Sequence, residues 1–226
     1  MLDWSEISTV LLDMDGTILD LHFDNQFWLH HLPKRYSESQ GISEQEAREK
    51  LVSHYQQVEG TIAWYCLDYW AEQTQLPITE LKRELQHLIA LRADAHDFLV
   101  ALRDSGRRIV LVTNAHPDSL SLKIERTQLD TYFDKLYSTH EFGATKESQL
   151  LWQRLQADEG FNVKNTLFVD DSINILKSAQ QFGIKHLLAI ANPDSQQAVR
   201  TIEEFPAITD YRSITAELLS TPFASA

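Results

Sequence analysis

An apolar run that ends in two acidic residues is the feature that most constrains this sequence. Val10-Leu11-Leu12 comes directly before Asp13-Met14-Asp15-Gly16-Thr17. Such a short aliphatic run is typical of a buried parallel strand. Side chains alternate along a strand, so Asp13 and Asp15 leave it on the same side, and Gly16 allows a sharp turn after them. Two crowded carboxylates are costly to ionise without a cation or a shared proton, so the segment predicts a chemical site at a strand end.

Strand-like runs alternate with helical patterns in the second half of the chain. The predicted strands are 108–112, 135–138, 166–169 and 186–190. The predicted helices are 94–105, 118–127, 146–159, 173–182 and a short one from about 215. This alternation predicts right-handed crossovers, and therefore an α/β fold with a Rossmann-like parallel sheet and helices on both faces.

Residues 22–90 carry helical patterns only. Asp24 is the expected N-cap of a first helix, and Ser43-Glu44-Gln45-Glu46 is a capping box for a helix to about residue 58. Helical patterns follow over 61–74 and 77–89. We therefore predict a small all-helical cap of residues 22–90, inserted after the first strand of an α/β core made of residues 1–21 and 91–226.

Composition limits the partners of this chain. A formal charge of −13 over 226 residues argues against binding a nucleic-acid polymer, which requires clustered Lys and Arg. Cys66 is the single cysteine, so no intrachain disulfide forms and a reducing compartment is the simpler interpretation. The sequence shows no targeting signal and no apolar stretch near the ~20 residues that span a bilayer. We expect a cytoplasmic protein without a membrane partner, with a monomer as the default where the sequence leaves the oligomeric state open.

Polar side chains follow several of the predicted strands. Asp13 and Asp15 follow the first, and the others are Thr113, Asn114, Lys146, Asp170 and Asp171. In parallel sheets the carboxyl ends of the strands share one edge, where ligands bind. Each of these features has an ordinary structural interpretation on its own, as a turn, a helix cap or a surface lysine. Their conjunction at strand ends favours a functional site.

The chemistry that suits this set is phosphoryl transfer through an aspartyl phosphate. Asp13 would attack phosphorus, and Asp15 would protonate the leaving oxygen and then deprotonate the hydrolytic water. Asp13 and Asp170 would supply hard oxygen ligands to Mg²⁺. The phosphoryl oxygens would be bound by Thr113, Asn114 and Lys146.

The ordered motifs resemble those of a known family. Asp13-Met14-Asp15-Gly16-Thr17-Ile18, Thr113-Asn114, Lys146 and Asp170-Asp171 are similar to the four motifs of the haloacid dehalogenase superfamily, and the helical insert resembles its C1-type cap. The resemblance implies that Asp13 is the nucleophile, that the backbone carbonyl at Asp15 also contacts Mg²⁺, and that Asp171 binds the metal more loosely. An acid at the position of Asp15 fits the phosphatases and phosphomutases of the superfamily.

More narrowly, the chain resembles the bacterial purine nucleotidases that act on GMP and IMP. The similar segments are 21–28, 64–70, 113–117, 138–143, 192–195 and 210–212. The resemblance implies a Mg²⁺-dependent phosphomonoesterase whose substrate is a small molecule, a purine nucleoside 5′-monophosphate. Two alternatives stay open: a phosphatase or phosphomutase for a phosphorylated sugar, and a non-catalytic metal-dependent binding or regulatory protein.

The cap segment is rich in aromatic residues, most of which we expect to hold the helices together. Trp28 and Trp64 are the candidates for stacking on a purine, with Asn25 as a hydrogen-bond partner. None of the nine histidines lies in a metal-ligand motif such as His-Glu-x-x-His. His116 alone follows a site motif, where capping the loop is favoured over contact with substrate. We interpret Cys66 as a small core residue.

Overall fold

The computed structural model describes residues 2–221 and contains a six-stranded parallel sheet with the order β3-β2-β1-β4-β5-β6. The strands are β1 (Thr9–Leu12), β2 (Arg108–Thr113), β3 (Lys135–Ser138), β4 (Thr166–Asp170), β5 (His186–Ile190) and β6 (Ala207–Ile208). Every neighbouring pair is parallel. Because β1 lies between β2 and β4 and is parallel to both, its carboxyl end lies beside the carboxyl ends of both strands. The predicted fold class is confirmed.

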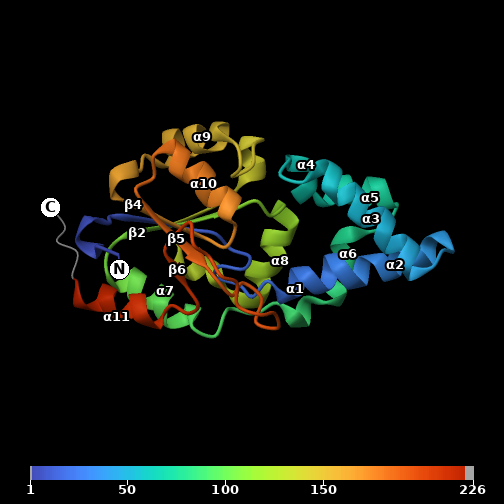
Figure 1. Ribbon diagram of the computed structural model, residues 1–226, viewed down its shortest axis with the longest axis horizontal. Coiled ribbons are helices and arrows are strands. Elements are labelled where there is room, and N and C mark those ends of the chain that lie inside the picture. The colour runs from blue at the N-terminus through green and yellow to red at the C-terminus, as the bar shows by residue number, and fades with distance from the viewer. Residues whose placement is uncertain (1, 222–226) are drawn as a thin grey trace.

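Helices cover both faces of the sheet, as Figure 1 shows. The helices α7 (Ala95–Asp104) and α11 (Arg212–Ser220) pack on one face through a buried cluster that includes Phe98 and Ile214. On the other face, α9 (Gln149–Glu159) and α10 (Ile173–Phe182) pack through a cluster around Trp152 and Phe168. The helix α8 (Pro117–Thr127) follows β2 and contributes Leu122 to a third cluster. Short 3₁₀ turns lie at Trp4–Glu6, Gln86–Leu88, Leu129–Tyr132, Thr139–Phe142 and Val163–Asn165.

A group of helices lies at one end of the molecule, beyond the ends of the sheet (Figure 1). They are α1 (His22–Gln26), a π-helical turn (Phe27–His31), α2 (Leu32–Gln40), α3 (Glu44–Val58), α4 (Ile62–Tyr65), α5 (Leu67–Thr74) and α6 (Ile78–Glu84). Phe27, Leu51 and Trp70 belong to a buried cluster of their own. Phe23 on α1 packs instead with residues of the sheet region. Residues 22–90 are called the cap below, and the domain boundaries stay a prediction.

Several predicted boundaries were wrong. Asp24 lies inside α1 rather than at its N-cap, because its carboxylate binds two lysines of other elements. The aromatic segment 61–74 breaks at Cys66, whose backbone is extended. Lys146 lies in the loop before α9, which is capped by Ser148. His116, not Asp118 or Ser119, caps α8.

The turn after β1 brings the backbone close to two other loops. Gly16 has a φ of +82°, and a Cβ atom there would lie 2.9 Å from Asp171 Cγ and 2.9 Å from Pro193 Cβ. The backbone N–H groups of Ile18 and Leu19 both donate to the carbonyl of Met14. The predicted sharp turn at glycine is therefore observed, and it requires glycine both for its left-handed backbone and for space.

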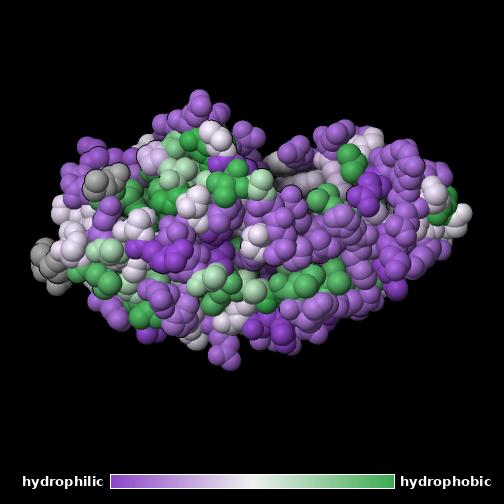
Figure 2. Space-filling model, turned by 60° about the horizontal axis from the view of Figure 1, so that its bottom comes forward, coloured by the Kyte–Doolittle hydropathy of each residue, from purple (hydrophilic) through white to green (hydrophobic). Residues whose placement is uncertain are grey.

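Hydrophilic residues cover most of the face drawn in Figure 2, with hydrophobic residues in small groups between them. Among residues 2–221, the large hydrophobic side chains that are exposed are Leu29, Val52, Leu150, Val199 and Leu219. Within residues 2–221, no helix combines the length and apolar character needed to cross a bilayer.

Candidate active site

A buried lysine lies between two buried aspartates at the carboxyl edge of the sheet. Lys146 Nζ donates to Asp13 Oδ1, and it donates to Asp170 Oδ2 at 2.7 Å. All three side chains are at most 7% exposed. The buried carboxylates hold the pKa of Lys146 above its ordinary value, so this ammonium is charged at neutral pH. The structure thus brings together the three predicted residues that come from three separate junctions.

Sheet register places the aspartates beside each other. Leu12 pairs with Val169, and the backbone N–H of Asp13 donates to the carbonyl of Val169 at 3.0 Å. Asp13 and Asp170 therefore follow paired positions on neighbouring strands. Lys146 reaches them from the loop before α9, where its backbone N–H donates to Asn114 Oδ1 at 3.0 Å.

Asp13, Asp170 and Asp171 form a cluster that can hold a metal ion. Each offers a carboxylate oxygen, and these oxygens lie within 4.8 Å of one another. Burial raises the pKa of Asp13 and Asp170 to about 6 despite the charge of Lys146. Burial and the charge of Asp13 raise the pKa of Asp171 to about 7, although Arg200 opposes this shift. Crowded carboxylates that resist ionisation are the donor set that a hard divalent cation relieves, so these residues fit Mg²⁺.

Asp15 belongs to a second buried network, which runs from the core to the cap. Lys123 Nζ donates to Asp15 Oδ1 at 2.6 Å and to Asp24 Oδ2 at 2.7 Å. Lys82 Nζ, from α6, donates to Asp24 Oδ1 at 2.8 Å. Burial raises the pKa of Asp15 to about 6 even though Lys123 opposes it. Two lysines hold the pKa of Asp24 far below its ordinary value despite burial. Asp15 can therefore exchange a proton near neutral pH while Asp24 stays ionised.

Sequence reasoning missed Lys82, Lys123 and Asp24 as site residues. The sequence does contain one signal for Lys123. The helical spacing of α8 places Lys123 on the same buried face as Ser119 and Leu122. A lysine on the apolar face of a helix needs a buried anionic partner. The sequence does not identify that partner, because Asp15 and Asp24 lie about a hundred residues away.

Thr113 and Asn114 end β2 and connect the loops around the site. Thr113 Oγ1 accepts from the backbone N–H of Ala115 at 3.0 Å. Asn114 Oδ1 accepts from the backbone of Lys146 and from Thr139, and Asn114 Nδ2 donates to Glu147 at 3.1 Å. The Asn114 side chain therefore holds the Lys146 loop in place. Both residues line the cavity described next, and their role as phosphate ligands stays a prediction.

A cavity of about 280 Å³ lies between the core and the cap. Asp13, Asp15, Lys146 and Asp170 line its core side. Aromatic side chains line its cap side, and they are Trp28, Tyr55, Trp64, Tyr65 and Trp70. The cavity thus places charged residues that suit a phosphate opposite rings that suit a base.

The candidate substrate residues of the cap all line this cavity, and they are Asn25, Trp28 and Trp64. The ring of Trp64 packs edge-on against Tyr55, with centroids 5.2 Å apart. Asn25 Nδ2 donates to Asp194 Oδ2 at 2.6 Å, so its amide is already engaged. The contacts of these residues with substrate stay predictions.

His116 lines the cavity and also caps α8, because its Nδ1 accepts from the backbone N–H of Asp118 at 3.3 Å. The expected capping role is thus present. Its ring lies edge-on to that of His140, with centroids 5.1 Å apart. Burial and the neighbouring His116 lower the pKa of His140, which is therefore neutral at neutral pH.

One known protein family matches most of the chain. The family model described as haloacid dehalogenase-like hydrolase matches residues 7–183. The matched segment contains the turn after β1, the end of β2, Lys146 and the aspartates that end β4. All four predicted motif positions therefore fall within the match.

Individual proteins resemble the chain over nearly its whole length. It is 45% identical over 216 residues to GMP/IMP nucleotidase YrfG of Escherichia coli strain K12, covering 96% of this chain and 97% of that protein. A HAD phosphatase from Thermococcus onnurineus is 24% identical, with a TM-score of 0.77 over 94% of this chain and 98% of that one. L-2-haloacid dehalogenase from Xanthobacter autotrophicus is 14% identical, with a TM-score of 0.63 over 93% and 97%. At such identities the two solved structures support the fold alone.

Mg²⁺ should stabilise the protein more at about pH 7.5 than at about pH 5.5. The pKa values of about 6 to 7 at Asp13, Asp170 and Asp171 lie above the ordinary 3.8, so protons compete with the metal as pH falls through that window. At a hundredfold excess over Kd, the Tm should rise by roughly 5–10 °C at the higher pH. Thermal unfolding with Mg²⁺ and with EDTA measures this, and an equal Tm rise at both pH values would contradict it.

Removing Lys123 should destabilise the fold far more than neutralising its neighbour Glu125. Lys123 is 1% exposed and links Asp15 to Asp24, whereas Glu125 is 58% exposed and pairs with Arg83 at 3.0 Å. Both residues reach from α8 to the cap. Lys123→Met leaves the Asp15 carboxylate without its lysine partner and Asp24 with Lys82 alone, and should cost about 3–5 kcal/mol, against less than about 1 kcal/mol for Glu125→Gln. Urea unfolding of both variants measures the difference, and similar losses would show that the buried network contributes little.

Proposed function

Because this chain belongs to the haloacid dehalogenase-like hydrolases, we propose that it is a Mg²⁺-dependent phosphomonoesterase that hydrolyses purine nucleoside 5′-monophosphates, GMP or IMP. The observation that carries the proposal is the shared cavity, in which Asp13 and Asp15 face the aromatic side chains of the cap. The similarity to a GMP/IMP nucleotidase over 96% of the chain supports the substrate class.

In the first step, a carboxylate oxygen of Asp13 attacks the phosphorus atom of the ester. The bond between phosphorus and the leaving oxygen breaks, and Asp15 donates its proton to that oxygen, which leaves as the nucleoside hydroxyl. A pKa of about 6 for Asp15 keeps enough of its protonated form near neutral pH. The products of this step are an aspartyl phosphate and the nucleoside.

In the second step, water hydrolyses the aspartyl phosphate. The water oxygen attacks phosphorus while Asp15, now a carboxylate, takes a proton from that water. The bond between phosphorus and the carboxylate oxygen of Asp13 then breaks. Inorganic phosphate is released, and both aspartates return to their starting states. The ammonium of Lys123 holds one carboxylate oxygen of Asp15. The other carboxylate oxygen would serve the leaving oxygen in the first step and the water in the second.

The charge that develops on phosphorus oxygens would be offset by Lys146 and by backbone and hydroxyl donors of the loop that starts at Thr113. Asp13, Asp170 and Asp171 would hold Mg²⁺, whose contribution is to neutralise phosphate charge and align the ester with Asp13. Because Asp13, Asp170 and Lys146 are buried, their interactions are stronger than in bulk water.

Asp13→Asn should abolish phosphate release from GMP, with a loss of about 10⁴-fold or more, because the amide oxygen is a poor nucleophile. Asp118→Asn is the matched control, since its side chain is 55% exposed beside the site and should keep near-normal activity. Inorganic phosphate release in Mg²⁺ measures both variants. Substantial turnover by Asp13→Asn would overturn the assignment of the nucleophile.

The same assay ranks substrates. A panel of nucleoside monophosphates and sugar phosphates separates a nucleotidase from the sugar-phosphate alternative, and product analysis detects any phosphoryl transfer to a second sugar position.

Trp64→Ala should reduce kcat/KM for GMP by roughly 5–150-fold relative to that for a simple sugar phosphate, as expected from losing about 1–3 kcal/mol of stacking. Trp64→Phe should restore most of the preference. The ratio of the two substrates cancels any loss of folded protein, which matters because Trp64 also packs on Tyr55 and Trp70. An equal loss on both substrates would mean that Trp64 does not stack on the base.

A further inference from the structure

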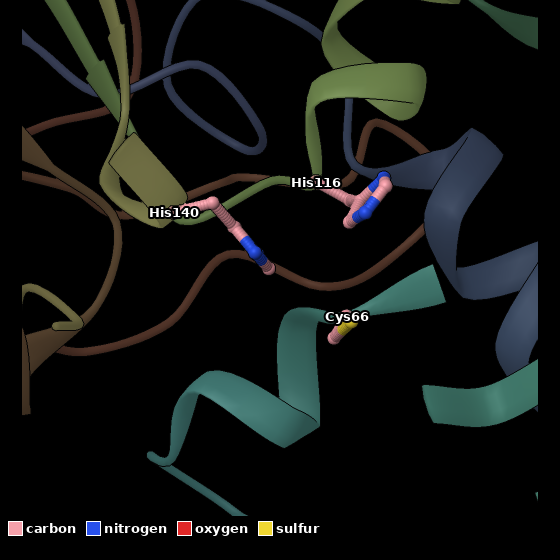
Figure 3. Close-up of side chains that lie close together, drawn as sticks. All are labelled: Cys66, His116 and His140. Atoms are coloured by element: carbon pink, nitrogen blue, oxygen red, sulfur yellow. The ribbon is translucent and has the colours of Figure 1, made fainter. Parts of the chain in front are cut away.

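Three side chains with soft or borderline donor atoms converge where the cap meets the core. Cys66 comes from the break between α4 and α5, and His116 and His140 come from the loops after β2 and β3. Figure 3 shows the three side chains pointing toward one another from separate segments. One ligand atom from each lies within 4.8 Å of those of the other two. The residues are far apart in sequence, so no motif indicates this cluster.

His140 presents an unused nitrogen to the cluster. Its Nε2 atom is buried and has no hydrogen-bond partner among residues 2–221. A neutral imidazole carries its proton on one ring nitrogen and a lone pair on the other. With the proton on Nδ1, the Nε2 atom of His140 offers its lone pair to the cluster, which is how a neutral histidine binds a metal through this atom. A buried polar atom without a partner is unfavourable, and a metal ion would satisfy it.

His116 and Asp68 extend the cluster. His116 Nε2 lies 3.6 Å from Asp68 Oδ2, and Nδ1 makes the long 3.3 Å bond to the backbone of Asp118. Either nitrogen could bind an ion by giving up one weak contact. Asp68, on α5 beside Cys66, is 84% exposed and can turn toward the cluster as a fourth ligand. The resulting donor set is one thiolate, two imidazoles and a carboxylate or water.

We propose that Cys66, His116 and His140 bind a borderline transition-metal ion, with Zn²⁺ as the reference ion, and that the bound ion ties the cap to the core. Thiolate and imidazole are the ligands that Zn²⁺ prefers, whereas Mg²⁺ prefers the carboxylates of the catalytic cluster.

The geometry is compatible with tetrahedral coordination. With Zn–N bonds of about 2.0 Å and Zn–S bonds of about 2.3 Å, ligand atoms lie roughly 3.3–3.6 Å apart. The ligand atoms of Cys66, His116 and His140 lie at most 4.8 Å apart, so each distance between two of them must shorten by at most about 1.5 Å. Rotations of the side chains can supply this change.

Such a site would inhibit turnover. Substrate reaches the cavity between the cap and the core, so the two parts must separate to admit substrate and release product. An ion bound by Cys66 on one side and the two histidines on the other opposes that separation. Because His116 lines the cavity, the bound ion would lie at the edge of that cavity.

Co²⁺ titration tests binding independently of any activity. Because Cys66 is the only cysteine, thiolate-to-cobalt charge-transfer absorption in the near ultraviolet reports this site alone, even with saturating Mg²⁺ in the carboxylate cluster. We expect one equivalent of Co²⁺ to produce the band, Zn²⁺ to displace it, and Cys66→Ser to remove it. His140→Gln should weaken binding by at least about 100-fold, whereas His96→Gln, whose side chain is 59% exposed, should leave it unchanged. No band in the parent protein, or an equal band in His140→Gln, would overturn the site.

Two further measurements test whether the bound ion holds the cap to the core. With the carboxylate cluster saturated by Mg²⁺, Zn²⁺ should raise the Tm of the parent protein and not that of Cys66→Ser. With saturating Mg²⁺, Zn²⁺ should inhibit phosphate release by the parent protein and spare Cys66→Ser, whose activity without Zn²⁺ should be normal because Cys66 lies outside the catalytic set. Equal inhibition of both would mean that Zn²⁺ acts at the carboxylates, and the inhibitory role would be wrong even if cobalt binding is observed.

Discussion

The ion pairs of Lys146 with Asp13 and Asp170 are the interactions on which the site depends. Without the ammonium, two buried carboxylates would face each other across neighbouring strands, and one of them would stay protonated. Lys146 opposes the effect of burial on both aspartates, favours their ionised forms at neutral pH and holds them close together. The backbone N–H of Lys146 donates to Asn114, so the loop after β2 helps to position the lysine that pairs with the aspartates of β1 and β4.

The second buried network gives the cap its position. Asp24 on α1 accepts from Lys123 of the core and Lys82 of the cap, so one carboxylate joins both parts. The same Lys123 binds Asp15. A displacement of α1 would therefore change the charge around Asp15. This arrangement links the position of the cap to the group assigned to proton transfer, through direct contacts.

Local patterns predicted the sheet well, because short aliphatic runs that alternate with helical patterns are typical of buried parallel strands. The two-residue β6 has no such run and was missed. Local patterns failed where a distant partner decides the outcome. Asp24 looks like an N-cap by itself, but two lysines bind it inside a helix. Lys146 looks like the first turn of a helix, yet the aspartates hold it in a loop. A long-range ion pair does not change the residues that adjoin its members in the sequence. The partners of Lys123 could therefore not be identified from sequence.

The turn at Gly16 has a consequence for metal choice. Since the turn after β1 contacts Asp171 and Pro193 with no room for even a methyl group, the backbone sets the spacing between the loops that carry Asp13 and Asp171. Side-chain rotation can adjust that spacing only slightly. The radius of the ion that fits between these carboxylates is therefore fixed mainly by the main chain, and discrimination between a small and a large divalent cation would persist through substitutions in the outer shell of the site.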